Sequence, residues 1–274
     1  MSNPPTDLAH PFDQALALEP LGDHRWQGHT SPAYANMVGP FGGLTAAQAL
    51  AGVLRHSECL GDPVALTVNF AAALASGPFE VIARPARTNR STQHWVVEMQ
   101  QSGQTVLTAT VVTAVRRQTW SADALPMPKV PAPNDTPRTF REAPVEWIKR
   151  YEMRFLEGHF PTAWDGREGG SRTRLWLRDD PPRGIDFASL AALADVFYPL
   201  IWQRRALRVP IGTVSMTTYF HATAAELAAV AGGFILGEAR ASAFRNGYFD
   251  QTAHLWSEAG ALLASTHQLV YYKE

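Results

Sequence analysis

The pattern of apolar and polar positions in the first half of the chain predicts one helix followed by antiparallel strands. Apolar residues recur at helical spacing between Leu44 and His56, directly after Phe41-Gly42-Gly43. Four runs of β-branched or alternating residues follow and are expected to be strands: Val64–Phe70, Val81–Thr88, His94–Gln101 and Thr105–Val115. Because only the turn at Ser102-Gly103 separates the last two runs, we expect them to form a long hairpin.

A segment rich in proline interrupts this pattern between Arg116 and Trp147. Its prolines are Pro126, Pro128, Pro131, Pro133, Pro137 and Pro144. Proline has no N–H to donate to a strand ladder and favours an extended path. We therefore expect an N-terminal unit over residues 1–115, a linker over 116–147 and a C-terminal unit over 148–274.

The same order of elements returns after the linker. Short alternating runs around Tyr151–Phe155 and Thr173–Arg178 precede a helix that we predict over Ala188–Arg204. The predicted strands that follow are Gly212–His221, Phe234–Phe244, Tyr248–Trp256 and a last run that ends at Tyr272 after a turn at Glu258–Gly260.

Local matches support a tandem duplication. Phe41 aligns with Phe187, LTVNF (Leu66–Phe70) with MTTYF (Met216–Phe220), and SGQTVLTAT with AGALLAST. A long helix followed by long antiparallel strands buries its apolar face when the sheet wraps around it. The expected fold class is therefore α+β, a double hotdog in which two tandem helix-wrapped antiparallel sheets form a pseudo-dimer.

Composition narrows the function. The chain is 46% hydrophobic and 18% charged, which is typical of a packed globular protein, and its formal net charge of -1 argues against nucleic-acid binding. Cys59 is the only cysteine, so the chain has no internal disulfide and no thiolate metal cluster. The sequence lacks a signal-peptide pattern and an apolar run of membrane-spanning length, so we expect a soluble, cytoplasmic protein with no membrane partner.

Several catalytic motifs are absent from the sequence. It contains no G-x-S-x-G elbow, no phosphate-binding G-x-x-x-x-G-K-[ST] or G-x-G-x-x-G loop, and no H-E-x-x-H zinc motif. Together these absences leave a reaction without cofactor or metal, or no reaction.

Asp195 is the one charged residue of the apolar stretch ASLAALADVFYPLIW. Burial of a carboxylate raises its pKa, so such a residue needs polar partners nearby. Gln268 is polar where the matching position of the first copy is Val112, and Thr213 lies in the predicted strand Gly212–His221. Ser215, Thr217 and Thr218 are alternatives for the hydroxyl.

These residue types suit the hydrolysis of a thioester. A carboxylate of raised pKa can deprotonate water, while an amide and a hydroxyl orient that water. Gly42 and Gly43 begin the first predicted helix, where backbone N–H groups can stabilise an oxyanion. Each residue also has a plain structural interpretation: a helix-edge aspartate, a surface glutamine, a packing threonine or a tight glycine turn.

The chain resembles the acyl-CoA thioesterase II family of tandem double-hotdog enzymes. The resemblance runs through LALEPLGDHRWQG, FGGLTAAQAL, TNRSTQHWVVEMQQSGQ, YEMRFLEG, TRLWLRDD, LAALADVF, IGTVSMTTYFH and LLASTHQ, and so covers nearly the whole chain. It implies acyl-CoA substrates, no cofactor and water activation by an Asp, a Thr and a Gln of the second hotdog, which fall here on Asp195, Thr213 and Gln268.

The chain departs from the family at two places. YFHATAAE and NFAAALASG both lack the Arg-Pro pair that usually follows these strands, which leaves the coenzyme A contacts and the substrate length open. Arg87 and Arg90 are expected to meet coenzyme A phosphates, or else to be solvated. Because hotdog sheets commonly pair further, a homodimer is the expected assembly.

Two alternatives to hydrolysis remain. The chain could be a non-catalytic module that binds acyl-CoA or an acyl lipid, since the missing Arg-Pro pairs indicate an altered entrance to the binding site. A hydratase or dehydratase would need a catalytic histidine, for which His221 and His267 are candidates, although neither belongs to an Asp-x-x-x-x-His arrangement.

Overall fold

The computed structural model describes residues 9–139 and 145–274. The first eight residues of the predicted N-terminal unit, and Pro144 of the predicted linker, lie outside the described residues. None of the described helices combines the length and the apolar character needed to span a bilayer.

The first half contains the predicted helix and strands. The helix is α2 (Gly42–Leu54), and the strands are β3 (Asp62–Phe70), β4 (Pro78–Thr88), β5 (Thr92–Gln101) and β6 (Gln104–Ala114). The sequence pattern did not predict α1 (Pro11–Ala15), β1 (Glu19–Gly22), β2 (Arg25–His29) or the 3₁₀ turn η1 (Pro32–Tyr34). β1 and β2 extend the sheet beyond β4.

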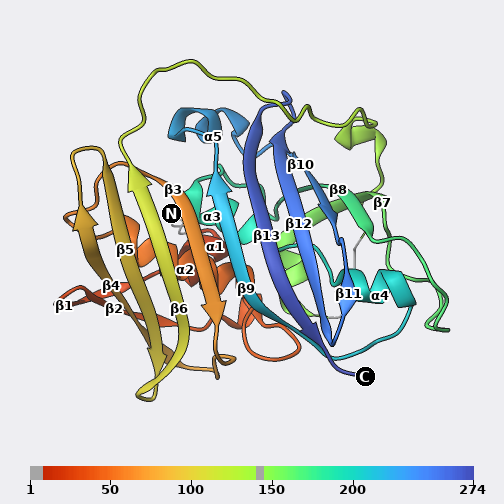
Figure 1. The fold of residues 1–274 in the computed structure, drawn as a ribbon, viewed down its shortest axis with the longest axis horizontal. Helices are drawn as coiled ribbons and strands as arrows, with labels where there is room; N and C mark the ends of the chain where they lie inside the picture. The colour runs from red at the N-terminus through yellow and green to blue at the C-terminus, as the bar shows by residue number, and fades with distance from the viewer. Residues whose placement is uncertain (1–8, 140–144) are drawn as a thin grey trace, which may run out of the picture.

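The second half repeats this plan. The proline-rich segment contains η2 (Pro133–Asp135). The elements that follow are η3 (Glu146–Arg150), β7 (Tyr151–Glu157), β8 (Arg172–Asp179), α3 (Phe187–Leu193), α4 (Leu200–Arg205), β9 (Ile211–Phe220), α5 (Ala224–Val230), β10 (Ile235–Arg240), β11 (Phe244–Arg245), β12 (Tyr248–Ser257) and β13 (Leu262–Tyr272). The double-hotdog expectation is confirmed, because each half-sheet wraps around a buried helix, α2 or α3 (Figure 1).

The predicted second helix is wrong in its length. The sequence predicted one helix over Ala188–Arg204, whereas α3 ends at Leu193 and α4 begins only at Leu200. Pro199 explains the break, because proline lacks an N–H, its ring clashes with the carbonyl four residues earlier, and it disfavours a helical residue before it. As a result Asp195 lies in the turn that follows α3 and not within a helix.

The two halves join through β3 and β9 into one antiparallel sheet of 13 strands. At the centre of this seam Thr67 pairs with Thr217, and their hydroxyl oxygens lie 3.0 Å apart. The aligned segments Leu66–Phe70 and Met216–Phe220 make these two threonines equivalent positions of the repeat. Equivalent residues face each other only on a two-fold axis, so the pseudo-dimer axis passes between Thr67 and Thr217.

α2 and α3 lie side by side on the inner face of the sheet, behind the strands in Figure 1. Every residue from Gly43 to Val53 is buried, and most of them are apolar, as expected for a helix enclosed by its sheet. All of α3 is buried as well, and its N-terminus carries a capping box in which Asp186 and Ser189 bond each other's backbone N–H. The capping box fixes the start of α3 and hence the position of the turn that holds Asp195.

The proline-rich segment arches from β6 across the ends of the central strands (Figure 1) and then lies against the outer face of the second half. Its backbone carbonyls accept hydrogen bonds from side chains of the second half. The Trp256 Nε1–H donates to Leu125, the Trp176 Nε1–H to Pro131, and the Arg154 guanidinium to Pro133. Met127 and Val130 pack against a second, smaller core of Trp176, Phe234, Leu236 and Trp256.

Candidate active site

The Asp195 carboxylate lies where the two halves meet. Gln268 Nε2 of β13 donates to Asp195 Oδ1 at 2.8 Å. The backbone N–H of Gly43, in the first turn of α2, lies near this carboxylate and favours its ionised form. One acid of the second half is therefore held by an amide of its own half and by a helix N-terminus of the other half.

Glycine is required at the start of α2 because the backbones approach so closely. A Cβ at Gly42 would lie 2.9 Å from Asp195 Oδ2, and a Cβ at Gly43 would lie 2.6 Å from the Ala192 carbonyl oxygen. The first N–H groups of a helix have no partner within the helix and carry its positive dipole end. The Asp195 carboxylate, which lies beside this end of α2, complements its positive charge.

Burial dominates the electrostatics of Asp195. It raises the pKa of the Asp195 carboxyl to about 7, although the Gln268 amide and the Gly43 N–H pull the pKa in the opposite direction. A carboxyl with this pKa is substantially ionised at neutral pH and still basic enough to accept a proton. Such a group is well matched to general base catalysis near pH 7.

The strand register shows on which face of β9 each of the four candidate hydroxyls lies. Cross-strand partners share a face, and Gln268 pairs with Met216 on the inner face. A register shift between Leu269 and Val270 skips Val214, so that Thr213 pairs with the buried Val270. This bulge turns Thr213 towards the face that carries Gln268.

The other three hydroxyls differ from Thr213 in their surroundings. Ser215 and Thr217 alternate with the buried Met216 and Thr218, so they point to the outer face, where Thr217 meets Thr67. Thr218 is fully buried, and its hydroxyl has no hydrogen-bond partner among the described residues. Thr213 and Thr218 therefore remain the two inner-face hydroxyls of β9, and the assignment of Thr213 stays a prediction.

The structure does not bring Arg87 and Arg90 to Asp195. Both are exposed near the turn between β4 and β5, and Arg87 Nε donates to Asn89 Oδ1 at 3.0 Å. β5, β6, β3 and β9 separate β4 from β13, which corresponds to roughly 24 Å along the sheet at about 4.8 Å per strand step. A contact of these arginines with coenzyme A stays a prediction.

Neither candidate histidine lies with Asp195. His221 Nε2 contacts Ser265 Oγ at 2.9 Å, and Ser265 alternates with the inner-face residues of β13. The His267 side chain is 61% exposed and lies 3.8 Å from Asp250. Both histidines are on the outer side of the sheet, so the geometry gives no support to a hydratase that would use them with Asp195.

Asp179 is a second buried acid that the sequence interpretation missed. It is 1% exposed, and burial raises the pKa of its carboxyl to about 7, while Arg183 opposes this rise. The alternation along β8 carried the signal, because Asp179 falls on the inner face with Leu175 and Leu177. Among the described residues, no group of three or more His, Cys, Asp and Glu side chains is arranged to hold a metal ion.

Two half-sheets that each wrap a helix, joined edge to edge through β3 and β9 with an acid at their junction, define a double-hotdog protein. The sequence matches two protein-family models. The family model of the acyl-CoA thioesterase N-terminal domain covers residues 31–114, and that of the acyl-CoA thioesterase C-terminal domain covers residues 122–272. The chain belongs to the acyl-CoA thioesterase family.

Solved structures agree with this fold. A hotdog protein of unknown function from Alicyclobacillus acidocaldarius is 46% identical, with 97% of this chain and 99% of that chain covered and a TM-score of 0.92. The tesB protein of Mycobacterium avium subs paratuberculosis is 18% identical, with 96% and 98% covered and a TM-score of 0.78. Acyl-CoA thioesterase II TesB2 of Mycobacterium marinum is 17% identical, with 96% and 98% covered and a TM-score of 0.75. At these lower identities the likeness concerns the fold alone. No curated protein matches the sequence.

Proposed function

We propose that the protein hydrolyses an acyl-CoA to the free acid and coenzyme A, with Asp195 as the general base. The observation that carries this proposal is the Asp195 carboxyl itself, whose pKa is raised to about 7 by burial and which the Gln268 amide holds at 2.8 Å. Membership of the acyl-CoA thioesterase family supports the substrate class.

In the proposed reaction, a water molecule near Asp195 and Gln268 attacks the thioester carbonyl carbon. Asp195 takes one proton of this water as the new C–O bond forms, which leaves a tetrahedral oxyanion. The C–S bond then breaks, and the proton on Asp195 passes to the departing sulfur of coenzyme A. Asp195 is thereby ionised again and ready for the next water.

Gln268 and Thr213 have positioning roles in this proposal. The Gln268 amide fixes the orientation of the carboxylate, and the Thr213 hydroxyl, which the bulge turns to the same face, binds the attacking water. For the oxyanion we propose the N–H of Gly42 at the first position of α2. The Gly43 N–H already serves the Asp195 carboxylate, so its proposed role shifts from the oxyanion to the base.

A panel of acyl-CoAs with different chains, with release of free thiol as the readout, tests this proposal. The protein should turn over at least one chain class, and Asp195→Asn should lower kcat by about 100-fold or more because general base catalysis contributes at least this much. Asp165→Asn, a change at an exposed aspartate of the same half, is the matched control and should keep wild-type turnover.

Each failure has a distinct meaning. If no acyl-CoA is hydrolysed, the enzymatic proposal fails, and calorimetric binding of acyl-CoA under those conditions would point instead to a non-catalytic binding module. If Asp195→Asn hydrolyses acyl-CoA as fast as the wild type, only the assignment of the base is wrong.

A further inference from the structure

The outer face of the second half carries a row of arginines next to the proline-rich segment. Across β8, β10 and β12 the register aligns Arg174 with Glu238 and His254, and in the next row Arg172 with Arg240 and Thr252. All six side chains point away from α3, because they alternate with inner-face residues on their strands. This surface lies on the opposite side of the sheet from Asp195.

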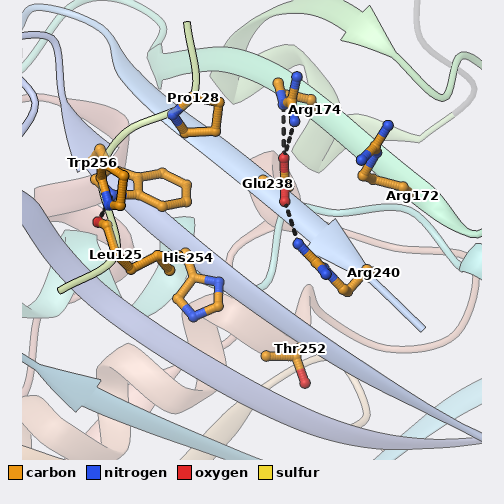
Figure 2. A pocket seen from close by; sticks show the side chains of 10 residues that line it. Leu125, Pro128, Arg172, Arg174, Glu238, Arg240, Thr252, His254 and Trp256 are labelled. Atoms are coloured by element: carbon orange, nitrogen blue, oxygen red, sulfur yellow. Dashed lines mark hydrogen bonds and ion pairs between the residues drawn. The ribbon is translucent and has the colours of Figure 1, made fainter. Parts of the chain in front are cut away.

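The proline-rich segment closes one side of this surface and makes it a pocket of about 580 Å³. Leu125, Pro126 and Pro128 of this segment line the pocket together with Trp256. The hydrogen bond from Trp256 Nε1 to the Leu125 carbonyl, 3.3 Å long, fastens the segment to the sheet (Figure 2). A volume of this size is typical of sites for small molecules.

The charges in the pocket are unbalanced. Glu238 accepts from Arg174 Nε at 2.8 Å and from Arg240 at 3.0 Å (Figure 2). Arg172 forms an ion pair with Glu157 at 2.8 Å. Three guanidinium groups thus face two carboxylates. Burial lowers the pKa of His254, so its imidazole adds no positive charge at neutral pH.

Arg172 and Arg240 are also direct cross-strand neighbours, an arrangement that is unfavourable for two like charges. Arg240 is 61% exposed and uses one N–H on Glu238, so its other donors are available to a ligand. An anion between Arg172 and Arg240 would remove their repulsion and accept charge-assisted hydrogen bonds from both.

The other end of the pocket is lined by apolar and aromatic side chains. Trp256 lies four residues along β12 from Thr252, the strand partner of Arg240, which is about 13 Å at roughly 3.3 Å per residue. Leu125 and Pro128 stand over this end, and the His254 and Trp256 rings lie 5.6 Å apart (Figure 2). The pocket thus has a cationic end and an apolar aromatic end.

We propose that this pocket binds a nucleotide, with its phosphate between Arg172 and Arg240 and its planar base against His254 and the Leu125 and Pro128 side chains of the proline-rich segment. A free nucleotide and the adenosine 3′-phosphate part of coenzyme A carry this same chemistry. The site is separate from the proposed hydrolytic site, so it can exist whether or not the protein hydrolyses acyl-CoA.

Isothermal titration calorimetry with AMP tests the proposal, with adenosine and inorganic phosphate as partial ligands and adenosine 3′,5′-bisphosphate as the coenzyme A fragment. AMP or the bisphosphate should bind at one site with a Kd below about 1 mM, and the tighter of the two identifies the source. Adenosine and phosphate should each bind at least about 10-fold more weakly, because each reaches only one end of the pocket.

Two variants locate the site. Arg240→Gln should weaken nucleotide binding by about 10-fold or more, and Thr252→Glu, which places an acid beside Arg240, should abolish it. Arg84→Gln is the matched control, since Arg84 is an exposed arginine on the first half of the sheet, and it should leave binding unchanged. Absence of nucleotide binding by the wild-type protein, or equal binding by Arg240→Gln, would overturn the proposal.

Discussion

At the scale of single residues, Asp195 combines two opposing influences. Burial raises the pKa of its carboxyl, while two hydrogen-bond donors, the Gln268 amide and the Gly43 N–H, favour the ionised form. Full burial without donors would keep the acid protonated at neutral pH, and full exposure would make the carboxylate too weak a base. The balance gives a carboxyl that titrates near the pH at which it would have to work.

The pH dependence of hydrolysis follows from this balance. Because only ionised Asp195 can accept a proton, kcat/KM should rise about tenfold per pH unit below the pKa of Asp195, about 7, and level off above it. Gln268→Leu removes a donor that favours the ionised form, so the rising limb should move to higher pH. A stopped assay of thiol release over a pH series measures both, and a flat profile between about pH 5 and 8 would contradict the assignment.

The ionisation of Asp195 should also change the stability of the fold, but in the opposite direction: activity rises with pH, whereas stability falls. The folded-state pKa of Asp195, about 7, lies above its ordinary value of 3.8, so the stability contributed by the protonated acid is present below about pH 4 and is lost as the pH rises through 7. Asp195→Asn stays neutral, so at pH 8 its free energy of unfolding should exceed that of the wild type by about 4 kcal/mol, from about three pKa units at roughly 1.4 kcal/mol each. At about pH 4 the two proteins should match. Urea denaturation at both pH values tests this.

At the scale of elements, periodicity predicted α2 and the long strands to within a few residues, because each buries one continuous apolar face. The break between α3 and α4 was missed, although Pro199 signalled it, because the apolar run continues on both sides. β1 and β2 were missed because they are short, with four and five residues, and because β1 is an exposed edge strand without alternation.

The candidate site was predictable in part for a similar reason. A charged residue in an apolar run and a polar residue that replaces Val112 in the repeat identified Asp195 and Gln268. The bulge that turns Thr213 inward and the commitment of the Gly43 N–H to Asp195 depend on register and on the packing between the halves. No local pattern encodes such long-range contacts.

The packing of α2 on the end of α3 leads to a prediction at this scale. Gly43→Ala places a Cβ 2.6 Å from the Ala192 carbonyl oxygen, and since that atom is backbone, the two helices must move apart. We expect a loss of about 1–3 kcal/mol in unfolding free energy, together with a drop in kcat as the N–H leaves Asp195. The control is Gly184→Ala, where a Cβ meets nothing within 4 Å, and it should change neither quantity. A Gly43→Ala protein with wild-type stability and kcat would refute the close-packed junction.

At the scale of the whole molecule, the two halves form one sheet through the β3–β9 seam, and the candidate site uses groups from both halves. A separate N-terminal half would lack Asp195 and Gln268, and a separate C-terminal half would lack the Gly43 N–H. The two repeats therefore form a pseudo-symmetric fold, but the proposed acid, Asp195, and the proposed amide, Gln268, both lie in the second repeat.

The seam should contribute to stability through the threonine pair on the pseudo-two-fold axis. Thr67→Val and Thr217→Val each leave one hydroxyl without its 3.0 Å partner, whereas the double variant removes both. A double-mutant cycle should give a coupling energy of about 0.5–1 kcal/mol. Strictly additive effects in chemical denaturation would show that the two hydroxyls do not interact.

The central claim is that Asp195 activates water and does not itself attack the thioester. A single turnover of acyl-CoA in ¹⁸O-labelled water, followed by mass spectrometry of the product acid and of the Asp195 peptide, separates these two roles. General base catalysis predicts one ¹⁸O atom in the free acid after the first turnover and none in Asp195. An unlabelled acid together with ¹⁸O in the Asp195 side chain would contradict the claim.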